Sequence, residues 1–598
     1  MFKILNMKNL KAIFLYSLLV FMSLSCKEKE VYETIAPLQQ LEIQFKNDLW
    51  ITALALDSLN ASENIKDKRS FYLKARMTFK VCEPILSFVD ASNYNFLNQP
   101  NIIKVKEEDF TDIKIDEPQG FQVIEELLFN NGRLDTEFLE QNVLITSMRL
   151  KLLHKNLTLK YLKEHHILWI IRDALNRVAL NGITGFDSPV LSNSLEESKT
   201  VYTSLKQILS IYESQFQNKD LFRNWMNEIE SSLAFLSEKD FNTFDRYTFI
   251  KQHTHKALGI WNQTVTDWNI TFPFKQPINY DVTNLFEKNT FNINHFTDQK
   301  ENPLAEEKVQ LGKMLFEDKT LSHKKTMSCA SCHKQELYFT DGLSKSPGTT
   351  RNSPTLFYAA LQKGFFHDKR TGSLEGQIVD VVNNPNEFHL SLNDLEKRVL
   401  ENEDYVTTFK KVYAKEIDNH LIRNAIASYI MSLSPFNSKF DLNMQDKENT
   451  LTQNEINGFN LFMGKAKCAT CHFAPLFNGL VPVAFKESEL ELIGVPKTKD
   501  TLNVVVDDDL GRYAVYKTEQ RKYFFKTPTI RNIEKTAPYM HNGVYTTLEE
   551  IVDFYNKGGG IGLGMTLENQ TLPFDKLNLT NQEKEDLVLF MKTLTDKF

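Results

Sequence analysis

The sequence predicts a mainly α-helical protein in which a long helical domain precedes two smaller helical units. Three observations lead to this prediction. Apolar residues in the first half recur at helix-like spacing, few segments alternate in the manner of a strand, and one five-residue cysteine pattern occurs twice in the second half. The 598 residues are too many for one hydrophobic core, and length alone suggests about three to four domains.

The composition is that of an ordinary globular protein, with 42% hydrophobic and 25% charged residues. The formal net charge of -7 supplies no basic excess to neutralise phosphates, so we expect no binding to nucleic acid. A mildly acidic surface is compatible with a basic redox partner.

The first 26 residues are predicted to be a lipoprotein signal peptide. Three lysines precede a short apolar run, residues 12–22, which is too short for an ordinary spanning helix. Small residues lead to Cys26, which we expect to be acylated after cleavage, although Leu24 makes the cleavage box imperfect. The alternative is a plain signal peptide in which Cys26 has no role. The prediction is therefore an exported protein of the periplasm or outer membrane, held to the membrane by a lipid at Cys26.

Residues 27–290 are predicted to form a helical accessory domain. Helix-like apolar spacing occurs from Tyr32 onward and in four further segments, residues 70–88, 136–153, 197–216 and 224–236. Residues 120–125 and 185–189 resemble the signature segments of imelysin-like helical domains. The histidine of that signature is Gln122 here, which weakens the case for a metal in this domain. The alternative is an unrelated helical bundle with a chance match.

Four of the six cysteines lie in two copies of a Cys-x-x-Cys-His motif: Cys329, Cys332 and His333, and Cys468, Cys471 and His472. This spacing lets two thiols reach the two vinyl groups of one haem, while the adjacent histidine supplies an axial nitrogen to the iron. A shared structural zinc, two redox dithiols or disulfides are the alternatives. Two copies that both carry the histidine, in an exported chain, favour two covalently bound haem c groups. We expect the isolated Cys82 to be a buried apolar residue.

Two haem units are predicted after an asparagine- and proline-containing linker at residues 275–302. They span residues 303–445 and 452–598, and each has a helix, a motif, a loop-rich stretch and closing helices. In the second unit, Thr580 and Glu583 form a capping box that starts the final helix. Small helical units wrapped around a haem match a cytochrome c-like fold. The predicted class is therefore mainly α, with two cytochrome c-like haem domains behind an α-helical accessory domain.

Residues 303–598 resemble the bacterial dihaem cytochrome c peroxidase/MauG family. In the first unit the likeness rests on residues 311–316, 321–322, 328–333, 339–342, 351–356, 373–377 and 384–387. In the second it rests on residues 464, 468–472, 509–512, 525–532, 537–543 and 547–550. The resemblance implies that the first haem is peroxidatic and that the second relays electrons to it. The reaction implied is reduction of hydrogen peroxide to water, with electrons from a small cytochrome or another periplasmic redox protein.

Two catalytic residues follow from the resemblance. Heterolytic cleavage of the O–O bond requires a proton to move from one peroxide oxygen to the other, so an acid/base group is needed beside the iron. Glu387 occupies the position of the family's distal glutamate, and Gln377 that of a distal glutamine. A glutamate in a largely apolar pocket has a raised pKa, as a proton shuttle requires. Without the motif, Glu387 would be taken for a surface carboxylate in a polar loop.

Three departures from the family pattern change the expectations. The loop at residues 344–350 has no histidine to cap the first iron, so we expect that iron to be held by His333 alone, as in MauG. His367 replaces the family's tryptophan between the haems and is a poorer electron relay; it could be a surplus distal ligand, but a hydrogen-bonded core histidine is the simpler interpretation. Tyr555 occupies the position of the second iron's distal ligand, as in MauG. The alternatives are Met540, an unligated iron, or a Tyr555 that only packs on its helix face.

The resemblance also implies a calcium ion between the haem units, at Asn352, Thr536 and Pro538. Calcium takes oxygen ligands, including backbone carbonyls and waters. Two other functions remain open at this point: a MauG-like oxidase that modifies side chains of a partner protein, and a non-catalytic electron-transfer lipoprotein. Glu387 and Gln377 argue against the last.

Overall fold

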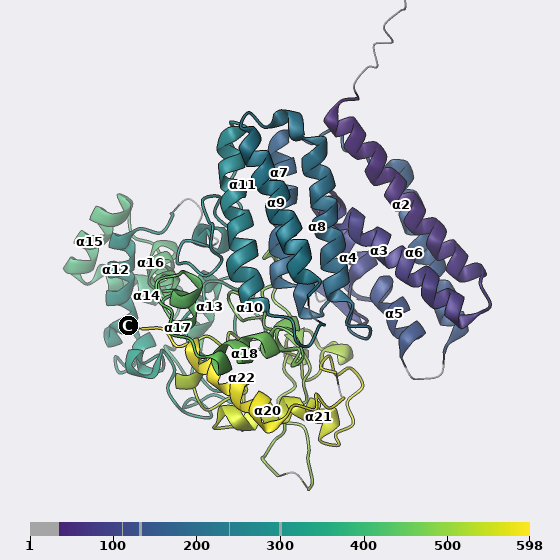
Figure 1. The fold of residues 1–598 in the computed structure, drawn as a ribbon. Helices are drawn as coiled ribbons and strands as arrows, with labels where there is room; N and C mark the ends of the chain where they lie inside the picture. Colours follow the sequence, from purple (N-terminus) through teal and green to yellow (C-terminus); the bar gives the residue numbers. More distant parts are fainter. Residues whose placement is uncertain are drawn as a thin grey trace, which may run out of the picture.

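The computed structural model describes residues 35–109, 112–130, 134–238, 240–297, 302–500, 502–573 and 575–597. This part of the chain is mainly helical and holds two sheets of two strands each, which confirms the predicted fold class (Figure 1). The predicted signal segment and Cys26 lie outside the described residues. Among the helices that are described, none is both long and apolar enough to cross a membrane.

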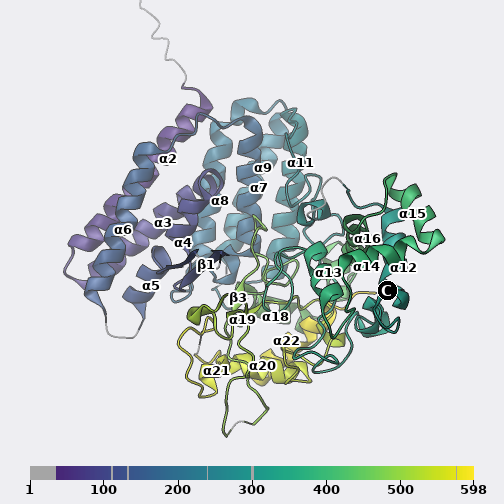
Figure 2. The same ribbon diagram turned by 180° about the vertical axis from the view of Figure 1, so that it is seen from behind.

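The first half of the chain is a helical domain, whose upright group α7, α8, α9 and α11 stands beside the tilted α2 and α6 (Figures 1 and 2). Its helices are α2 (Pro37–Ala61), α3 (Ile65–Val89), α4 (Ala91–Asn98), α5 (Phe121–Phe129), α6 (Thr136–Asn156), α7 (Glu164–Leu180), α8 (Ser194–Ile211), α9 (Lys219–Leu236), α10 (Arg246–Thr248) and α11 (His255–Asp267). A π-helical stretch, Phe249–Thr254, joins α10 to α11. The helical segments predicted at residues 70–88, 136–153, 197–216 and 224–236 correspond to α3, α6, α8 and α9.

Local signals explain several helix ends. Asn64 caps α3, because its side chain accepts a hydrogen bond from the backbone N–H of Lys66 (2.9 Å). Asp135 caps α6 in the same way, through the N–H of Phe138 (3.0 Å). The prediction that one helix extends to residue 216 was wrong, since α8 ends at Ile211. A short 3₁₀ turn, Glu213–Gln215, takes its place.

The core of the helical domain contains two tryptophans whose indole N–H groups are hydrogen-bonded. Trp225 and Trp261 are fully buried. The indole N–H of Trp261 donates to the carbonyl of Leu168 (2.6 Å), and that of Trp225 donates to the hydroxyl of Thr264 (2.8 Å). Cys82 is 1% exposed, which confirms its prediction as a buried residue.

A hairpin that the sequence did not predict projects from the helical domain. Its strands are β1 (Lys104–Asp109) and β2 (Asp112–Asp116), which pair antiparallel. The pairing is irregular between Glu107 and Asp109. Charged residues dominate both strands, so the apolar alternation that marks a half-buried strand is missing.

The first haem unit contains α12 (Glu306–Glu317), α13 (Leu374–Asn383), α14 (Leu392–Leu400), α15 (Glu403–Tyr413), α16 (Asn419–Ser432) and α17 (Lys439–Met444). Helix α12, which precedes the cysteine motif, crosses α16 at Gly312. A Cβ atom on Gly312 would lie 1.9 Å from the carbonyl oxygen of Ala425, so this close approach requires glycine.

The second haem unit repeats this crossing. It contains α18 (Gln453–Phe462), β3 (Leu490–Glu491), α19 (Tyr513–Tyr516), β4 (Phe525–Lys526), α20 (Leu548–Asn556), α21 (Gly559–Gly562) and α22 (Asn581–Thr593). Helix α18 precedes the second motif and crosses α22 at Gly458, where a Cβ atom would lie 2.0 Å from the carbonyl oxygen of Asp586. The predicted capping box starts α22, since Thr580 accepts from the N–H of Glu583 (3.2 Å).

A buried ion pair joins the two haem units. Arg531 of the second unit donates two 2.8 Å hydrogen bonds to the carboxylate of Asp441, and both side chains are fully buried. Arg531 also donates to the carbonyl of Pro475 (2.7 Å) and lies 3.3 Å from the phenol of Tyr358 in the first unit. The two units therefore share a fixed seam.

Candidate haem sites

The first cysteine motif forms a tight turn that presents its histidine for metal binding. Cys329–Ser331 is a 3₁₀ turn capped by Ser328. The Nδ1 atom of His333 lies 2.9 Å from the carbonyl oxygen of Phe339, a distance at which Nδ1–H donates. This bond leaves Nε2 with a free lone pair, which is what an axial iron ligand needs. Burial lowers the pKa of His333, and so favours the neutral imidazole that binds a metal.

The second motif repeats this arrangement. Cys468–Thr470 is again a 3₁₀ turn. Nδ1 of His472 lies 3.0 Å from the carbonyl oxygen of Pro528 and 3.3 Å from that of Phe477. Burial lowers the pKa of His472 to about 4, so the imidazole is neutral at physiological pH with Nε2 free.

The cysteine chemistry fits haem better than the alternatives. No disulfide joins the cysteines of either motif. Among the described residues, no three side chains of His, Cys, Asp or Glu gather into a group that could hold a metal ion, so a zinc shared by the motifs finds no support. Two cysteines beside a neutral, oriented imidazole are the donor set that haem c requires, and both motifs supply it.

Glu387 and Gln377 come from one helix and the turn that follows it. Gln377 lies on α13, and Glu387 lies just after the end of that helix. The amide of Asn384 donates to the Glu387 carboxylate (2.7 Å), which fixes its position. Burial raises the pKa of Glu387. The carboxylate is close enough to Cys329 and Cys332 to contribute to the raised pKa values of both thiols, so Glu387 lies beside the first motif.

Tyr555 lies near the second motif, and the backbone of Met540 lies at the seam between the haem units. Tyr555 is on α20. Its pKa is raised, first by burial and then by the charges of Cys471 and Cys468, so the phenol lies close to both cysteines. The backbone carbonyl of Met540 instead accepts a hydrogen bond from Asn352 (2.7 Å), which ties this residue to the seam between the haem units.

The residues of the expected calcium site come together at the seam. The side-chain Nδ2 of Asn352 donates to the carbonyls of Pro538 (3.1 Å) and Met540 (2.7 Å). Its Oδ1 atom is buried and has no hydrogen-bond partner. The two ends of an amide have nearly the same shape. Turned over, this amide would direct Oδ1 toward two carbonyl oxygens, the ligand type that calcium takes. Thr536 lies on the same loop, after the 3₁₀ turn Ile533–Lys535.

His367 is a hydrogen-bonded histidine at the seam. Its Nε2 lies 3.3 Å from the carbonyl oxygen of Asn352, and its own carbonyl accepts from the N–H of Lys526 (2.7 Å). Burial lowers its pKa to about 3, with the nearby Arg351 acting in the same direction, so the ring is neutral. These contacts favour the interpretation of His367 as a core histidine.

The loop at residues 344–350, which lacks the capping histidine, packs against the second haem unit. A Cβ atom on Gly543 would lie 2.4 Å from the Cα atom of Ser344. Within the loop, Ser346 donates to the carboxylate of Asp341 (2.6 Å). The loop therefore packs tightly on the turn that follows His541 in the second unit.

Glu491 is a site residue that the sequence reasoning missed. It ends strand β3, and its side chain lies close to Cys471 and Thr571. Burial and the neighbouring Glu489 raise the pKa of Glu491 to about 7. The only sequence signal is the alternation of glutamates at 487, 489 and 491, which is typical of one face of a strand.

Comparison with known proteins shows that the chain is similar to dihaem cytochrome c peroxidases and to MauG. The family model for di-haem cytochrome c peroxidase matches residues 306–449. The cytochrome-c peroxidase IdrP2 of Pseudomonas sp. (strain SCT) is 32% identical over 314 residues, covering 48% of this chain and 81% of the relative. The methylamine utilization protein MauG of Methylorubrum extorquens is 31% identical over 302 residues, covering 49% and 80%. The cytochrome c551 peroxidase of Nitrosomonas europaea is 33% identical over 293 residues, covering 48% and 79%.

Among solved structures, a MauG-like protein associated with microbial copper homeostasis matches with 28% identity and a TM-score of 0.45, covering 55% of this chain and 95% of that one. The sequence relatives alone establish the relationship, since the alignments cover most of each relative and about half of this chain. The chain belongs to the dihaem cytochrome c peroxidase/MauG family.

Proposed function

We propose that this protein reduces hydrogen peroxide to water with electrons delivered by a small redox protein. The observation that carries the proposal is the position of Glu387, a carboxyl group with a burial-raised pKa beside the first cysteine motif. When bound, the two haems would relay these electrons and provide the iron at which peroxide is reduced.

The role of the chain is to move one proton. With haem bound, the Glu387 carboxylate would take a proton from one peroxide oxygen and return it to the other, so that this oxygen can leave as water. Two further protons and the two electrons from the donor would convert the remaining oxygen to the second water. Burial raises the pKa of this carboxyl group above its usual value, which makes the carboxylate a stronger base for the first half of the transfer. Asn384, which donates to the carboxylate at 2.7 Å, holds Glu387 in place. Gln377, on the helix before it, supplies an amide that can orient the peroxide.

A Glu387→Gln variant tests this role. We expect peroxide turnover with a reduced small cytochrome to fall about 10²–10⁴-fold, because the amide can hydrogen-bond but cannot carry the proton. Stopped-flow oxidation of the cytochrome measures the rate. Glu401→Gln, which changes an exposed carboxylate at the end of α14, is the matched control and should keep the wild-type rate. Wild-type turnover in Glu387→Gln would show that another group moves the proton.

A MauG-like oxidase that modifies side chains of a partner protein is the second candidate. Two observations favour it: Tyr555 lies near the second motif, and the loop at residues 344–350 carries no histidine to cap the first iron. The stopped-flow experiment separates the two functions. A peroxidase oxidises the reduced cytochrome rapidly, whereas a dedicated oxidase consumes peroxide without oxidising it.

Two further features belong to the proposal. A calcium ion at Asn352, Thr536 and Pro538 would fix the relative placement of the two haems; its support is the unpartnered Oδ1 of Asn352. Export and acylation at Cys26 would place the protein on a membrane facing the periplasm, and the charge and apolar pattern of residues 1–26 supports this location. Mass spectrometry of the mature N-terminus, which should carry a diacylglyceryl cysteine, tests the anchor.

A further inference from the structure

The helical domain contacts the second haem unit on both sides of the second cysteine motif. Before the motif, Asn460 of α18 makes two hydrogen bonds to the helical domain: its Oδ1 accepts from the N–H of Tyr247 (2.9 Å), and its Nδ2 donates to Asp245 (3.0 Å). After the motif, the ring of Phe473 lies 5.9 Å from that of Phe186, nearly edge-on. The helical domain therefore forms a wall of the second haem site.

Both segments that resemble imelysin-like domains lie at or beside this wall. Phe186 belongs to the segment at residues 185–189. Glu126 directly follows the segment at residues 120–125; burial raises the pKa of its carboxyl group, and the nearby charge of Lys467 partly opposes this rise. Within the domain, the hydroxyl of Ser188 donates to Glu125 (3.2 Å), and so do the N–H groups of Val190 and Leu191 just after the second segment (3.0 Å). The carboxylate that the signature would offer to a metal is thus used to hold the two segments together.

Arg246 places a positive charge in this wall. Its side chain is fully buried, and its guanidinium donates to the backbone carbonyls of Ile183 (2.8 Å), Phe241 (2.7 Å) and Phe244 (3.1 Å). No carboxylate of the described residues forms an ion pair with it. A Cβ atom on Gly464 would lie 2.5 Å from Cζ of Arg246, so the guanidinium rests directly on this glycine.

The charge of Arg246 is shielded from water, and Asp240 and Asp245 act on it only from beyond ion-pair distance. Burial lowers its pKa to about 9, which still leaves the guanidinium protonated at neutral pH. Gly464 lies shortly before Cys468 in the chain, so this charge is close to the attachment point of the second haem. In a medium of low dielectric constant, a fixed positive charge stabilises an added electron on a nearby centre.

We propose that the helical domain tunes the second haem, and that Arg246, held against Gly464, raises the reduction potential of this haem. A higher potential would make the second haem a better acceptor of electrons from a donor. The proposal rests on the presence of the two haems and not on the peroxide reaction, so a failure of the peroxidase proposal would leave it standing.

Spectroelectrochemical titration of the full-length holoprotein tests the proposal, with the first haem as an internal reference. In Arg246→Gln we expect the potential of the second haem to fall while that of the first stays unchanged. Arg246→Lys, which keeps the charge, should stay near the wild-type value. Arg172→Gln is the matched control, because Arg172 is also buried in the helical domain, and its guanidinium lies 5.0 Å from the ring of Trp261 and 3.5 Å from the carbonyl oxygen of Asn279. It should leave both potentials unchanged.

A second variant, for which the opposite change in reduction potential is expected, keeps the test decisive if Arg246→Gln does not fold. Glu126→Gln removes a negative charge from the same wall and should raise the potential of the second haem. An unchanged second potential in every variant that folds and carries two haems would overturn the proposal. A parallel shift of both haems would also overturn it, because a general loss of structure, rather than one local charge, would then be the cause.

Discussion

At the scale of single residues, hydrogen bonds to backbone carbonyls decide what each histidine can do. His333 and His472 donate from Nδ1 to the carbonyls of Phe339 and Pro528, and keep Nε2 free. His367 places its Nε2 at the carbonyl of Asn352 instead. The same side chain therefore serves as a candidate iron ligand at two positions and as a seam residue at the third.

The identity of the distal ligand of the second haem iron can be tested by substitution. Tyr555→Phe should change the low-temperature spectrum of the ferric second haem and raise its potential, because it removes an oxygen ligand that favours the ferric state. Met540→Leu, at the other candidate position, should leave both unchanged. The reverse pattern would assign the ligand to Met540.

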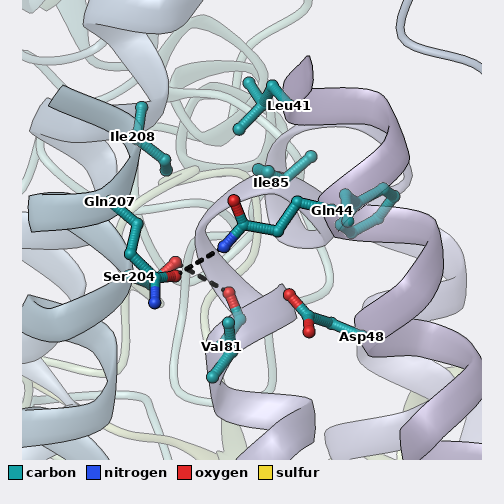
Figure 3. Close-up of a pocket in the computed structure, with 9 residues that line it drawn as sticks. Leu41, Gln44, Asp48, Val81, Ile85, Ser204, Gln207 and Ile208 are labelled. Carbon is teal, nitrogen blue, oxygen red and sulfur yellow. Dashed lines mark hydrogen bonds between the residues drawn. The ribbon is translucent and has the colours of Figure 1, made fainter. Parts of the chain in front are cut away.

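A carboxylate far from the haems predicts a pH-dependent stability. Asp48 faces a small pocket between α2, α3 and α8, beside Gln44 and Gln207, which are hydrogen-bonded to each other (2.8 Å; Figure 3). Burial raises the pKa of Asp48 from 3.8 to about 6. The folded protein thus binds this proton more tightly than the unfolded chain does. The carboxyl group costs no stability below pH 3.8, and its cost grows as the pH rises to about 6.

Asp48→Asn removes this cost. We expect the free energy of unfolding to rise by about 1 kcal/mol at pH 7, a small figure because the side chain is partly exposed and screened by solvent. Below pH 4 the variant and the wild type should unfold at the same temperature. Calorimetry at both pH values measures the difference, and equal stabilities at pH 7 would show that Asp48 titrates normally.

At the scale of elements, each haem unit depends on one helix crossing that only glycine permits. Gly312→Ala should lower the free energy of unfolding by about 1–3 kcal/mol, because the added methyl group would overlap the carbonyl of Ala425 and force α12 and α16 apart. Gly372→Ala is the control, since a Cβ atom there would meet nothing within 4 Å. Thermal unfolding measures both, and equal midpoints would mean that the crossing can relax.

The elements that could be predicted from sequence are those with a local signal. The helix after Thr580 has its capping box, and α6 shows apolar residues at helical spacing. The β1–β2 hairpin has no such signal, because its strands are charged and largely exposed. Its main anchor is a distant residue: Arg512 of the second unit pairs with Glu107 at 2.8 Å. A pairing between residues so far apart cannot be inferred from either segment.

The same distinction applies to the site residues: those in a contiguous motif can be predicted from sequence, and those brought together by packing cannot. The cysteine motifs and their histidines are contiguous, so spacing alone predicts their chemistry. Glu387 needs the family pattern, because a lone glutamate in a loop has no distinguishing mark. The contact of Arg246 with Gly464 and the position of Glu491 beside Cys471 depend on tertiary packing, and only the structure shows them.

At the scale of the whole molecule, the seam between the haem units fixes their relative placement. A buried ion pair, Arg531 with Asp441, secures one part of it, and the oxygen cluster around Asn352 secures another. If calcium binds this cluster, a chelator should lower the unfolding temperature of the wild type. Asn352→Ala should unfold at that lower temperature with or without the chelator, since ligand binding stabilises only a state that binds. An unfolding temperature of the wild type that does not change with the chelator would show that no calcium binds at this cluster.

The helical domain, the seam and the proton shuttle all have a role only if each cysteine motif carries a haem. Intact-mass spectrometry of the mature protein, combined with a quantitative haem spectrum, tests this most directly. We predict two haems bound covalently to each chain, and one haem in a variant with serine at Cys468 and Cys471. One haem or none on the properly matured wild-type chain would contradict the account.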